Sequence, residues 1–312
     1  EFRRVLFRSE KNMRKIITPV GLSAEQLKDI KQLENICSAH ERLRMKLNWD
    51  MLENRSSGRT KDFLCYWDNQ LIGFLGLYGF GQHPEEIELT GMVHPQFRRR
   101  KIFTALFDKT KKECADRKAG RILIISEGSS KSGIGFALSA GAVYSFSEFR
   151  MTFNGHRAPF SPGHGIVLRK AEPRDDPELR ELDAGHFGGV GTASEEASEE
   201  ASEGSGPPDE PYKTTYIAEL NGRSIGKIGT TMEGPAGYVF GFVIKPEYRG
   251  RGYGKETLSL ILSKLLSENI HTVLLEVAAE NNNALSLYKS YGFKEDTVYN
   301  YYELALQDHK SS

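Results

Sequence analysis

The sequence predicts an α/β (α+β) protein built from two tandem domains of similar design. Its 312 residues are enough for two ordinary domains. In each half a helix precedes a strand hairpin, a further strand, a turn, and then helices alternating with strands. Motifs also recur at a near-constant spacing, with Pro95 matching Pro246, Arg98 matching Arg249, and Gly141 matching Gly292. Several matches in the same order indicate an internal duplication.

The elements of the first half follow from its periodicity and turn residues. Ser23 caps an amphipathic helix, and Asp62–Phe80 reads as two strands joined by a turn at Asp68–Asn69. Ile87–Pro95 is the next strand. The remaining elements are a helix over 101–118, a strand over 121–126, a short helix, and a strand over 145–153.

The second half repeats this order. A strand and a helix are predicted over 166–183, and Thr214–Met232 forms a hairpin around Asn221–Gly222, a strong turn dipeptide. Gly237–Pro246 is the next strand, and Gly241 inside it indicates a bulge or a close backbone approach. A helix over 256–270, a strand over 271–277, a helix over 282–293 and strands over 294–306 complete the half.

Domain boundaries follow from composition. Residues 1–12 are interpreted as a non-native leader, since EFRRVLFRS reads like a translated sequencing adapter and Met13 can serve as the start. We place the first domain at 13–154, a Pro/Gly-rich linker at 155–165 and the second domain at 166–312. The acidic segment 188–211 lacks aromatic residues and is predicted to be a disordered, solvated loop; a mobile lid is the alternative.

The bulk composition excludes several classes of partner. Lys plus Arg and Asp plus Glu both number 42, so no net field favours nucleic acid or an anionic membrane. No apolar run is long enough to span a bilayer. Three widely spaced cysteines are typical of reduced thiols in the cytoplasm, and the eight histidines lack ligand spacing, so we expect no metal.

The most specific motif is the turn within Val243–Lys255, which reads VIKPEYRGRGYGK. Gly250, Gly252 and Gly254 remove side chains from the turn, so backbone N–H groups can close on a ligand oxygen. The helix that follows adds unpaired N–H donors and the positive end of its dipole. This construction is typical of a phosphate-binding site.

The chain resembles the GCN5-related N-acetyltransferase (GNAT) superfamily. The resemblance is carried by Arg249-Gly250-Arg251-Gly252-Tyr253-Gly254 and by Asn281, Tyr288 and Gly292-Phe293, on a strand–helix–strand–helix order. The second half is most similar to bacterial ribosomal-protein alanine N-acetyltransferases. The resemblance implies a mixed, mostly antiparallel sheet flanked by helices in each half. It also implies acetyl-CoA as cosubstrate, and transfer of its acetyl group to a primary amine by direct attack.

It further implies which residues bind coenzyme A. Backbone groups of one strand would hold the pantetheine, the turn would hold the pyrophosphate, and an asparagine would hydrogen-bond the cofactor. In chain order these residues are Phe242, Val243, Ile244, Arg249, Gly250, Arg251, Gly252, Tyr253, Gly254, Lys255 and Asn281. A plain tight turn and solvated surface charge are the alternatives for the glycines and for Arg251 and Lys255.

Two residues are candidates for proton transfer. Tyr288 is expected to protonate the departing thiolate, because a phenol stays protonated at neutral pH. In the alanine N-acetyltransferases a Glu at the spacing of Glu276 acts as base, which implies that Glu276 deprotonates the substrate ammonium. A core aromatic is the alternative for Tyr288, and an exposed or paired carboxylate at a strand end is the alternative for Glu276.

The first half departs from the family pattern at the positions that correspond to the cofactor-binding and proton-transfer residues of the second half. Lys101 and Phe103 replace two signature glycines, Ser130 stands for Asn281, and Ala137 stands for Tyr288. We therefore interpret this half as a degenerate, catalytically silent domain that supports the other.

Two alternatives to this enzyme remain open: a non-catalytic acyl-CoA-binding sensor or scaffold, and an acyltransferase that uses a longer acyl-CoA. The expected partner is a small-molecule or peptide amine, with no nucleic acid or membrane, and with the chain a monomer or homodimer.

Overall fold

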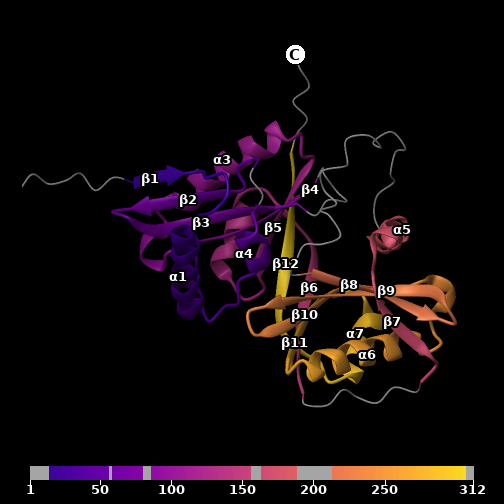
Figure 1. The fold of residues 1–312 in the computed structure, drawn as a ribbon. Helices are drawn as coiled ribbons and strands as arrows, with labels where there is room; N and C mark the ends of the chain where they lie inside the picture. Colours follow the sequence, from indigo (N-terminus) through magenta and orange to yellow (C-terminus); the bar gives the residue numbers. More distant parts are fainter. Residues whose placement is uncertain (1–13, 56–57, 80–85, 156–162, 188–212, 307–312) are drawn as a thin grey trace, which may run out of the picture. The chain divides into compact units, whose positions relative to one another are not determined.

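The structure is a computed structural model that describes residues 14–55, 58–79, 86–155, 163–187 and 213–306 (Figure 1). The predicted leader and the acidic loop, and most of the predicted linker, lie outside the described residues. The chain divides into two compact units. Unit 1 contains residues up to Tyr78, Glu85–Ala142 and the chain from Glu303 onward; unit 2 contains Val143–Tyr302 together with 79–84.

Unit 1 is built around strands in the order β1-β2-β3-β4-β5. All neighbouring strands are antiparallel except β4 and β5, which are parallel. The strands are β1 (Arg14–Ile17), β2 (Asp62–Trp67), β3 (Gln70–Tyr78), β4 (Glu86–Val93) and β5 (Arg121–Glu127). The helices are α1 (Ala24–Glu41), α2 (Trp49–Glu53), α3 (Ile102–Asp116) and α4 (Lys131–Ser139).

Alternation along β3 places helices of unit 1 on opposite faces of its sheet. Phe74 packs with Ile30 and Leu33 of α1 in one buried cluster. A Cβ atom on the preceding residue, Gly73, would lie 2.8 Å from a methyl group of Ile102 in α3. The predicted cap of α1 is confirmed, because the Ser23 hydroxyl accepts a hydrogen bond from the Gln26 N–H.

Unit 2 has strands in the order β12-β6-β11-β10-β9-β8-β7. Only β10 and β11 are parallel among the pairs whose registers are defined. The strands are β6 (Val143–Asn154), β7 (Ile166–Lys170), β8 (Lys213–Leu220), β9 (Arg223–Glu233), β10 (Ala236–Ile244), β11 (Thr272–Ala278) and β12 (Lys294–Ala305). The helices are α5 (Asp176–Phe187), α6 (Tyr253–Ser267) and α7 (Asn282–Ser290).

Strand β6 lies in unit 2 although the sequence analysis assigns its residues to the first domain. Its C-terminal part pairs with β11, from Asn154↔Thr272 to Glu148↔Ala278. Buried apolar residues Met151 and Phe153 of β6 join the cluster formed with α6 and α7. The apolar side chains of this strand are therefore buried against elements of the second half of the chain.

Helices α6 and α7 cover one face of the unit 2 sheet. Leu258 and Leu262 of α6 and Leu285 of α7 pack with Ile228 and Val273 of the strands. Lys227 is next to Ile228 and so points to the opposite face, where its ammonium pairs with Asp183 of α5. The layered arrangement of helices about a mixed sheet confirms the predicted fold class.

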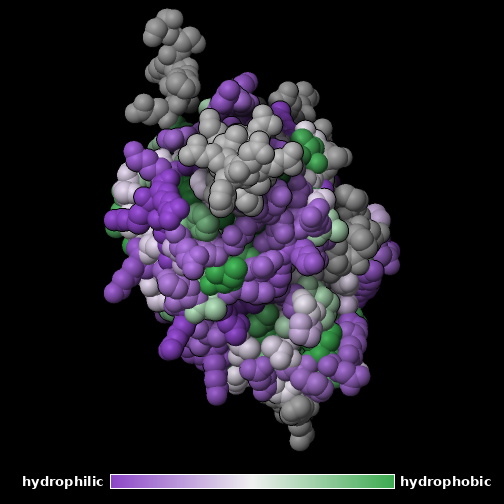
Figure 2. Space-filling view, turned by 90° about the vertical axis from the view of Figure 1, so that its left-hand side faces the viewer, coloured by the Kyte–Doolittle hydropathy of each residue, from purple (hydrophilic) through white to green (hydrophobic). Residues whose placement is uncertain are grey.

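The predicted hairpin turn is also confirmed. Asn221 and Gly222 join β8 to β9 with φ values of 52° and 74°, as a two-residue turn with both residues left-handed requires. No described helix is long and apolar enough to cross a membrane. On the face drawn in Figure 2, hydrophilic side chains predominate and apolar residues form small separate groups.

Candidate active site

The candidate site begins where two parallel strands of unit 2 separate. Strand β10 pairs with β11 only over Gly237–Val239, against Val273–Leu275. Beyond this point β11 stays bonded to β6 as far as Ala278. The inner edges of β10 and β11 therefore carry backbone groups that do not pair with each other, and the space between them can admit an extended ligand.

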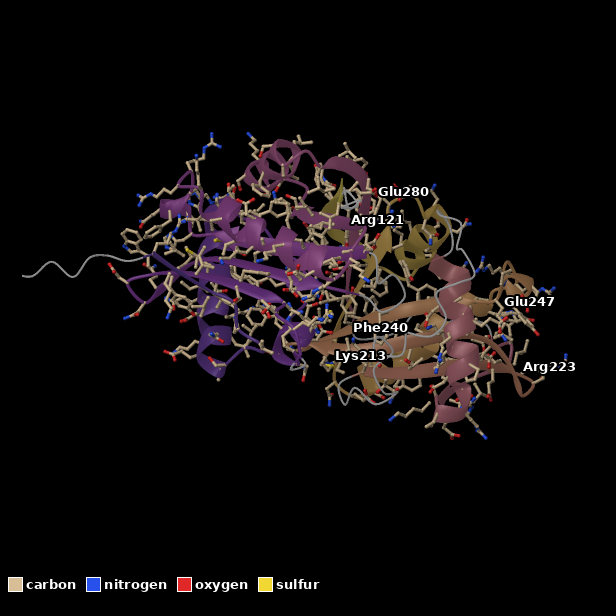
Figure 3. The ribbon with its side chains drawn as sticks, turned by 90° about the horizontal axis from the view of Figure 1, so that it is seen from above. Arg121, Lys213, Arg223, Phe240, Glu247 and Glu280 are labelled. Carbon is tan, nitrogen blue, oxygen red and sulfur yellow. The ribbon has the colours of Figure 1, made fainter. Side chains whose placement is uncertain are left out.

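A bulge in β10 marks the point of separation. The register against β9 shifts between Phe240 and Val243, and Gly241 has a φ of 55°. Phe240, labelled in Figure 3, is the last residue before the shift, and its ring lies 2.5 Å from the position of a Cβ atom on Gly229. The predicted bulge at Gly241 is thus confirmed, and it redirects the backbone of Phe242, Val243 and Ile244.

The glycine turn follows directly. A short 3-10 turn at Pro246–Tyr248 leads to Gly250 and Gly252, with φ values of 75° and 85° that favour glycine. Gly252 is the N-cap of α6. In the described part of the chain, no backbone hydrogen bond uses the N–H groups of residues 250–255. Six consecutive donors beside a helix N-terminus suit the oxygens of a diphosphate.

Side chains around the turn have distinct surroundings. Arg249 donates from Nε to the Ile244 carbonyl at 2.7 Å, which ties the turn to the end of β10. Arg251 and Lys255 are exposed. The Lys255 carbonyl accepts a hydrogen bond of 2.7 Å from the hydroxyl of Tyr291. The exposed charges can therefore reach a ligand while Arg249 and Tyr291 hold the backbone.

Helix α7 presents two further candidates, Asn281 and Tyr288. Asn281 is the N-cap, and its Oδ1 accepts from the Ala284 N–H at 3.1 Å. Tyr288 is buried and packs against Phe293, with ring centroids 5.8 Å apart. Burial raises the pKa of Tyr288 to about 12. No hydrogen bond uses the Tyr288 hydroxyl within the described ranges, so the phenol retains its proton for another partner.

Glu276 lies on β11 directly after its last pair with β10. It is opposite Arg150 of β6, and Arg150 Nη1 lies 3.7 Å from Glu276 Oε1. Arg150 also donates to Glu233 at 2.6 Å. Burial alone would lower the pKa of Arg150, but the hydrogen bond that Arg150 donates to Glu233 and the nearby carboxylates outweigh it and raise that pKa. The charged guanidinium therefore lies beside the Glu276 carboxylate.

The structure brings all the predicted residues into one unit. Phe242 to Ile244 lie along the separating edge, and residues 249–255 form the turn and the start of α6. Glu276 lies on β11, Asn281 caps α7 and Tyr288 lies on α7. Sequence reasoning missed Arg150, because its position in the chain assigns it to the first half. It also missed the contact of His164 with Glu256 (Nδ1 to Oε2, 2.8 Å), because neither residue belongs to a motif.

The corresponding turn of unit 1 has a similar backbone conformation, but aromatic side chains pack beside it. Arg99 and Lys101 have φ values of 64° and 57°, at the positions of Gly250 and Gly252. Phe103 stands at the position of Gly254 and packs edge-on against Phe136, with centroids 4.5 Å apart. A Cβ atom on Gly91 of β4 would lie 2.9 Å from the Phe103 ring. Aromatic side chains thus occupy the region next to this turn.

Comparison with known proteins places a chain of this fold among the acyltransferases. The acetyltransferase (GNAT) family model matches residues 25–141 and again 178–293, so the chain belongs to this family. The two matches show that the chain is a tandem member and an acyltransferase.

Curated relatives agree with this assignment. Mycothiol acetyltransferase of Mycolicibacterium smegmatis is 27% identical over 289 residues, which are 89% of this chain and 95% of the relative. The [ribosomal protein bS18]-alanine N-acetyltransferase of Salmonella typhimurium is 32% identical over 74 residues, which are 24% of this chain and half of the relative.

Solved structures share the fold over nearly the whole chain. A GCN5-related N-acetyltransferase from Sphaerobacter thermophilus has a TM-score of 0.72 at 16% identity, covering 94% of this chain and 95% of that one. A tandem GNAT protein from the clavulanic acid biosynthesis pathway has a TM-score of 0.64 at 16% identity, covering 94% and 98%. At these identities the likeness concerns the fold.

Proposed function

We propose that the second half of this chain binds acetyl-CoA and transfers the acetyl group to a primary amine by direct attack. The observation that carries the proposal is the coincidence, in unit 2, of the strand separation after Val239, the bulge at Gly241 and the open glycine turn. Each feature alone occurs in many folds, but together they match the three parts of an acyl-CoA: thioester, pantetheine and diphosphate.

The binding residues fit these parts in chain order. Backbone groups of Phe242, Val243 and Ile244 would bond the pantetheine as an added strand does. The N–H groups of residues 250–255, with Arg249, Arg251 and Lys255 beside them, would hold the diphosphate. Asn281, at the start of α7, would contribute a side-chain hydrogen bond from its amide nitrogen, since its Oδ1 already caps the helix.

One backbone N–H at the bulge would stabilise the charge that develops on the thioester oxygen as the amine attacks. The redirected backbone at Gly241 and Phe242 provides a position for that donor, because there β10 is paired neither to β11 nor in register with β9.

Tyr288 is proposed as the acid that protonates the departing thiolate. Its burial in the cluster of α6 and α7 keeps the phenol neutral, since the pKa is raised to about 12. A neutral phenol whose hydroxyl the described residues leave unused can donate its hydrogen to the sulfur as charge builds on it.

Glu276 is proposed as the base that takes the proton from the acceptor ammonium, directly or through water. Its carboxylate lies where β10 and β11 separate, and Arg150 Nη1 is 3.7 Å from it. We expect Glu276 to contribute less to the rate than Tyr288 does, because the fraction of the amine that is already deprotonated does not need a base.

The first half is proposed to have a structural or acceptor-shaping role. Phe103 and Phe136 pack beside its turn, and Ala137 stands where Tyr288 stands in the second half. Without the open turn and the phenol, this half has neither the donor site nor the acid.

The relatives' names define which acceptors to test. One relative, which matches most of this chain, is named a mycothiol acetyltransferase. Another, which matches a shorter stretch, is named for acetylating the alanine of a ribosomal protein. An acceptor panel should therefore contain mycothiol-related amines, peptides with an N-terminal alanine, polyamines and amino sugars.

The proposal is tested by following CoA release from acetyl-CoA with this panel, on the full chain. We expect saturable turnover with at least one amine, lowered about 100-fold in Tyr288→Phe. Tight acetyl-CoA binding with no turnover on any amine, unaltered in Tyr288→Phe, would instead support a sensor or scaffold. Faster turnover with a longer acyl-CoA would change the donor and leave the rest of the proposal intact.

A further inference from the structure

A hydrogen-bonded histidine–glutamate pair lies beside the glycine turn of unit 2 and joins it to the segment before β7. Glu256 is in the first turn of α6, and its side chain is only 7% exposed. His164 precedes β7, and its Nδ1 lies 2.8 Å from Glu256 Oε2. The same carboxylate accepts from the backbone N–H groups of His164, at 2.6 Å, and Ile166, at 3.1 Å. Glu256 thus fixes both the backbone and the ring of His164.

The hydrogen bonds determine which nitrogen of His164 faces outward. Burial alone would raise the pKa of Glu256, but the hydrogen bonds from His164 and Ile166 outweigh it and lower that pKa. An ionised carboxylate only accepts hydrogen bonds, so Nδ1 of His164 carries a hydrogen. Nε2 is then the nitrogen that remains for a ligand, and in the imidazolium form it is also a donor.

The ring lies directly against the turn. A Cβ atom at Gly252 would be 3.1 Å from His164 Cε1 and 3.5 Å from Nε2. The ring also packs edge-on against Tyr253, with centroids 5.4 Å apart. His164 remains about one-third exposed. Its Nε2 edge therefore lies close to Gly252, one of the residues whose N–H groups no described backbone hydrogen bond uses.

The duplication gives an internal comparison. In unit 1 the residue at the position of Glu256 is Ala105, and the turn there carries Lys101 in place of Gly252. The half without the open turn therefore lacks the carboxylate that would hold a histidine beside it. A buried carboxylate near an anion site is costly unless a cation is paired with it. Glu256 stands beside the glycine turn of unit 2, whereas unit 1 has no carboxylate at this position, so we infer that Glu256 has a role at that turn.

We propose that His164 is a ligand-binding residue for the diphosphate of acetyl-CoA, and that Glu256 is the residue that positions it. The inference rests on the proposed function and adds to it a residue from outside the GNAT motifs. In this arrangement Nε2 donates to a diphosphate oxygen while Nδ1 donates to Glu256. The imidazolium also offsets the carboxylate charge that would otherwise oppose the ligand.

The test compares two substitutions at His164 with ligands of different length. His164→Asn keeps an N–H near the position of Nδ1 but removes Nε2, whereas His164→Gln can place an amide nitrogen near the position of Nε2. His40→Asn, at an exposed histidine of α1, is the matched control. Dissociation constants are measured by calorimetry for acetyl-CoA and for dephospho-CoA, which keeps the diphosphate. They are measured by ligand-observed NMR for S-acetylpantetheine, which lacks it.

We expect His164→Asn to weaken acetyl-CoA and dephospho-CoA about tenfold, as the loss of one charge-assisted hydrogen bond implies. S-acetylpantetheine should be unaffected, His164→Gln should recover part of the loss, and His40→Asn should match the wild type. Equal binding of acetyl-CoA by the wild type and both His164 variants would overturn this inference and leave the proposed function standing. So would an equal loss for all three ligands. A wild type that binds no acetyl-CoA would overturn both.

Discussion

The turns that precede α3 in unit 1 and α6 in unit 2 share a backbone path but differ in what surrounds it. Both follow a short 3-10 turn, and both have two left-handed residues. In both, an arginine closes back on the preceding strand: Arg98 on the Val93 carbonyl at 3.2 Å, and Arg249 on the Ile244 carbonyl at 2.7 Å. The duplicated turns therefore share their backbone conformation in both halves.

The side chains and the strands beside the turns differ. Strand β4 pairs with β3 without a shift in register, whereas β10 is bulged at Gly241. In unit 1, Arg98 is bound to Glu41 at 2.7 Å, and Phe103 packs against Phe136. Backbone conformation alone is thus not a criterion for a cofactor site in this protein; the space above the turn and the bulge in the strand distinguish the two halves.

The largest effect is expected from transferring a side chain of the silent turn to the open one. In Gly254→Phe, the Cβ would lie 3.7–3.9 Å from Ile244, Phe242 and Leu287, so these side chains leave little room for a phenyl ring, and we expect the ring to extend into the proposed ligand space. We expect kcat/KM for acetyl-CoA to fall at least about 100-fold, because backbone donors can no longer approach the diphosphate. Phe103→Gly is the reciprocal control and should leave acetyl transfer unchanged; a large loss there would assign a donor site to unit 1.

Removing the phenol should have the next largest effect. Tyr288→Phe keeps the packing against Phe293 and is expected to lower kcat by about 100-fold, within the range for a general acid. Burial raises the pKa of Tyr288 to about 12, so the phenol stays protonated below that pH. The wild-type kcat should therefore show no loss from tyrosine ionisation between about pH 7 and 10. Tyr144→Phe, at an exposed tyrosine, is the control; equal kcat for both variants would exclude Tyr288 as the acid.

A smaller effect is expected at Glu276. Glu276→Gln removes a proton acceptor but keeps the size of the side chain opposite Arg150, and we expect kcat/KM for the amine to fall about tenfold. If Glu276 acts as a base, the loss should shrink as pH rises, because more of the amine is already deprotonated. Glu295→Gln alters an exposed carboxylate that pairs with Lys289 at 2.7 Å and serves as the control. A loss independent of pH would indicate that Glu276 only fixes Arg150.

The smallest effect concerns stability in the silent half. Lys101 has a φ of 57°, a conformation that costs a side-chain-bearing residue about 1–2 kcal/mol. Lys101→Gly should raise the free energy of unfolding by about 0.5–1 kcal/mol after the entropy of glycine is subtracted, with acetyl transfer unchanged. Lys112→Gly, at an exposed position within α3, should destabilise the protein by about 1 kcal/mol. Denaturant melts of both variants measure the difference, and equal losses would contradict the strain at Lys101.

Much of the architecture could be predicted from local sequence signals. Ser23 predicted a helix cap, Asn221–Gly222 a hairpin, and Gly241 a bulge, and the structure has all three. These signals succeed because each depends on the conformation of one or two residues. The helix after the glycine turn begins at Tyr253, three residues earlier than predicted, because Gly252 itself serves as the N-cap.

The rest depends on contacts between distant segments, which periodicity does not encode. Arg150 lies opposite Glu276 only because β6 joins the sheet of unit 2, and strand order is set by tertiary packing. His164 and Glu256 are 92 residues apart and belong to no motif. A single glutamate in the first turn of a helix is usually explained by its favourable interaction with the positive end of the helix dipole. Nothing in the sequence therefore indicated a histidine partner for Glu256.

The stoichiometry of acetyl-CoA binding tests the central claim most directly. Calorimetric titration of the full chain should give one equivalent per chain for the wild type and no saturable binding for Gly254→Phe, with Phe103→Gly again giving one. Two equivalents for the wild type, or one equivalent that survives in Gly254→Phe, would contradict the assignment of the donor site to the second half.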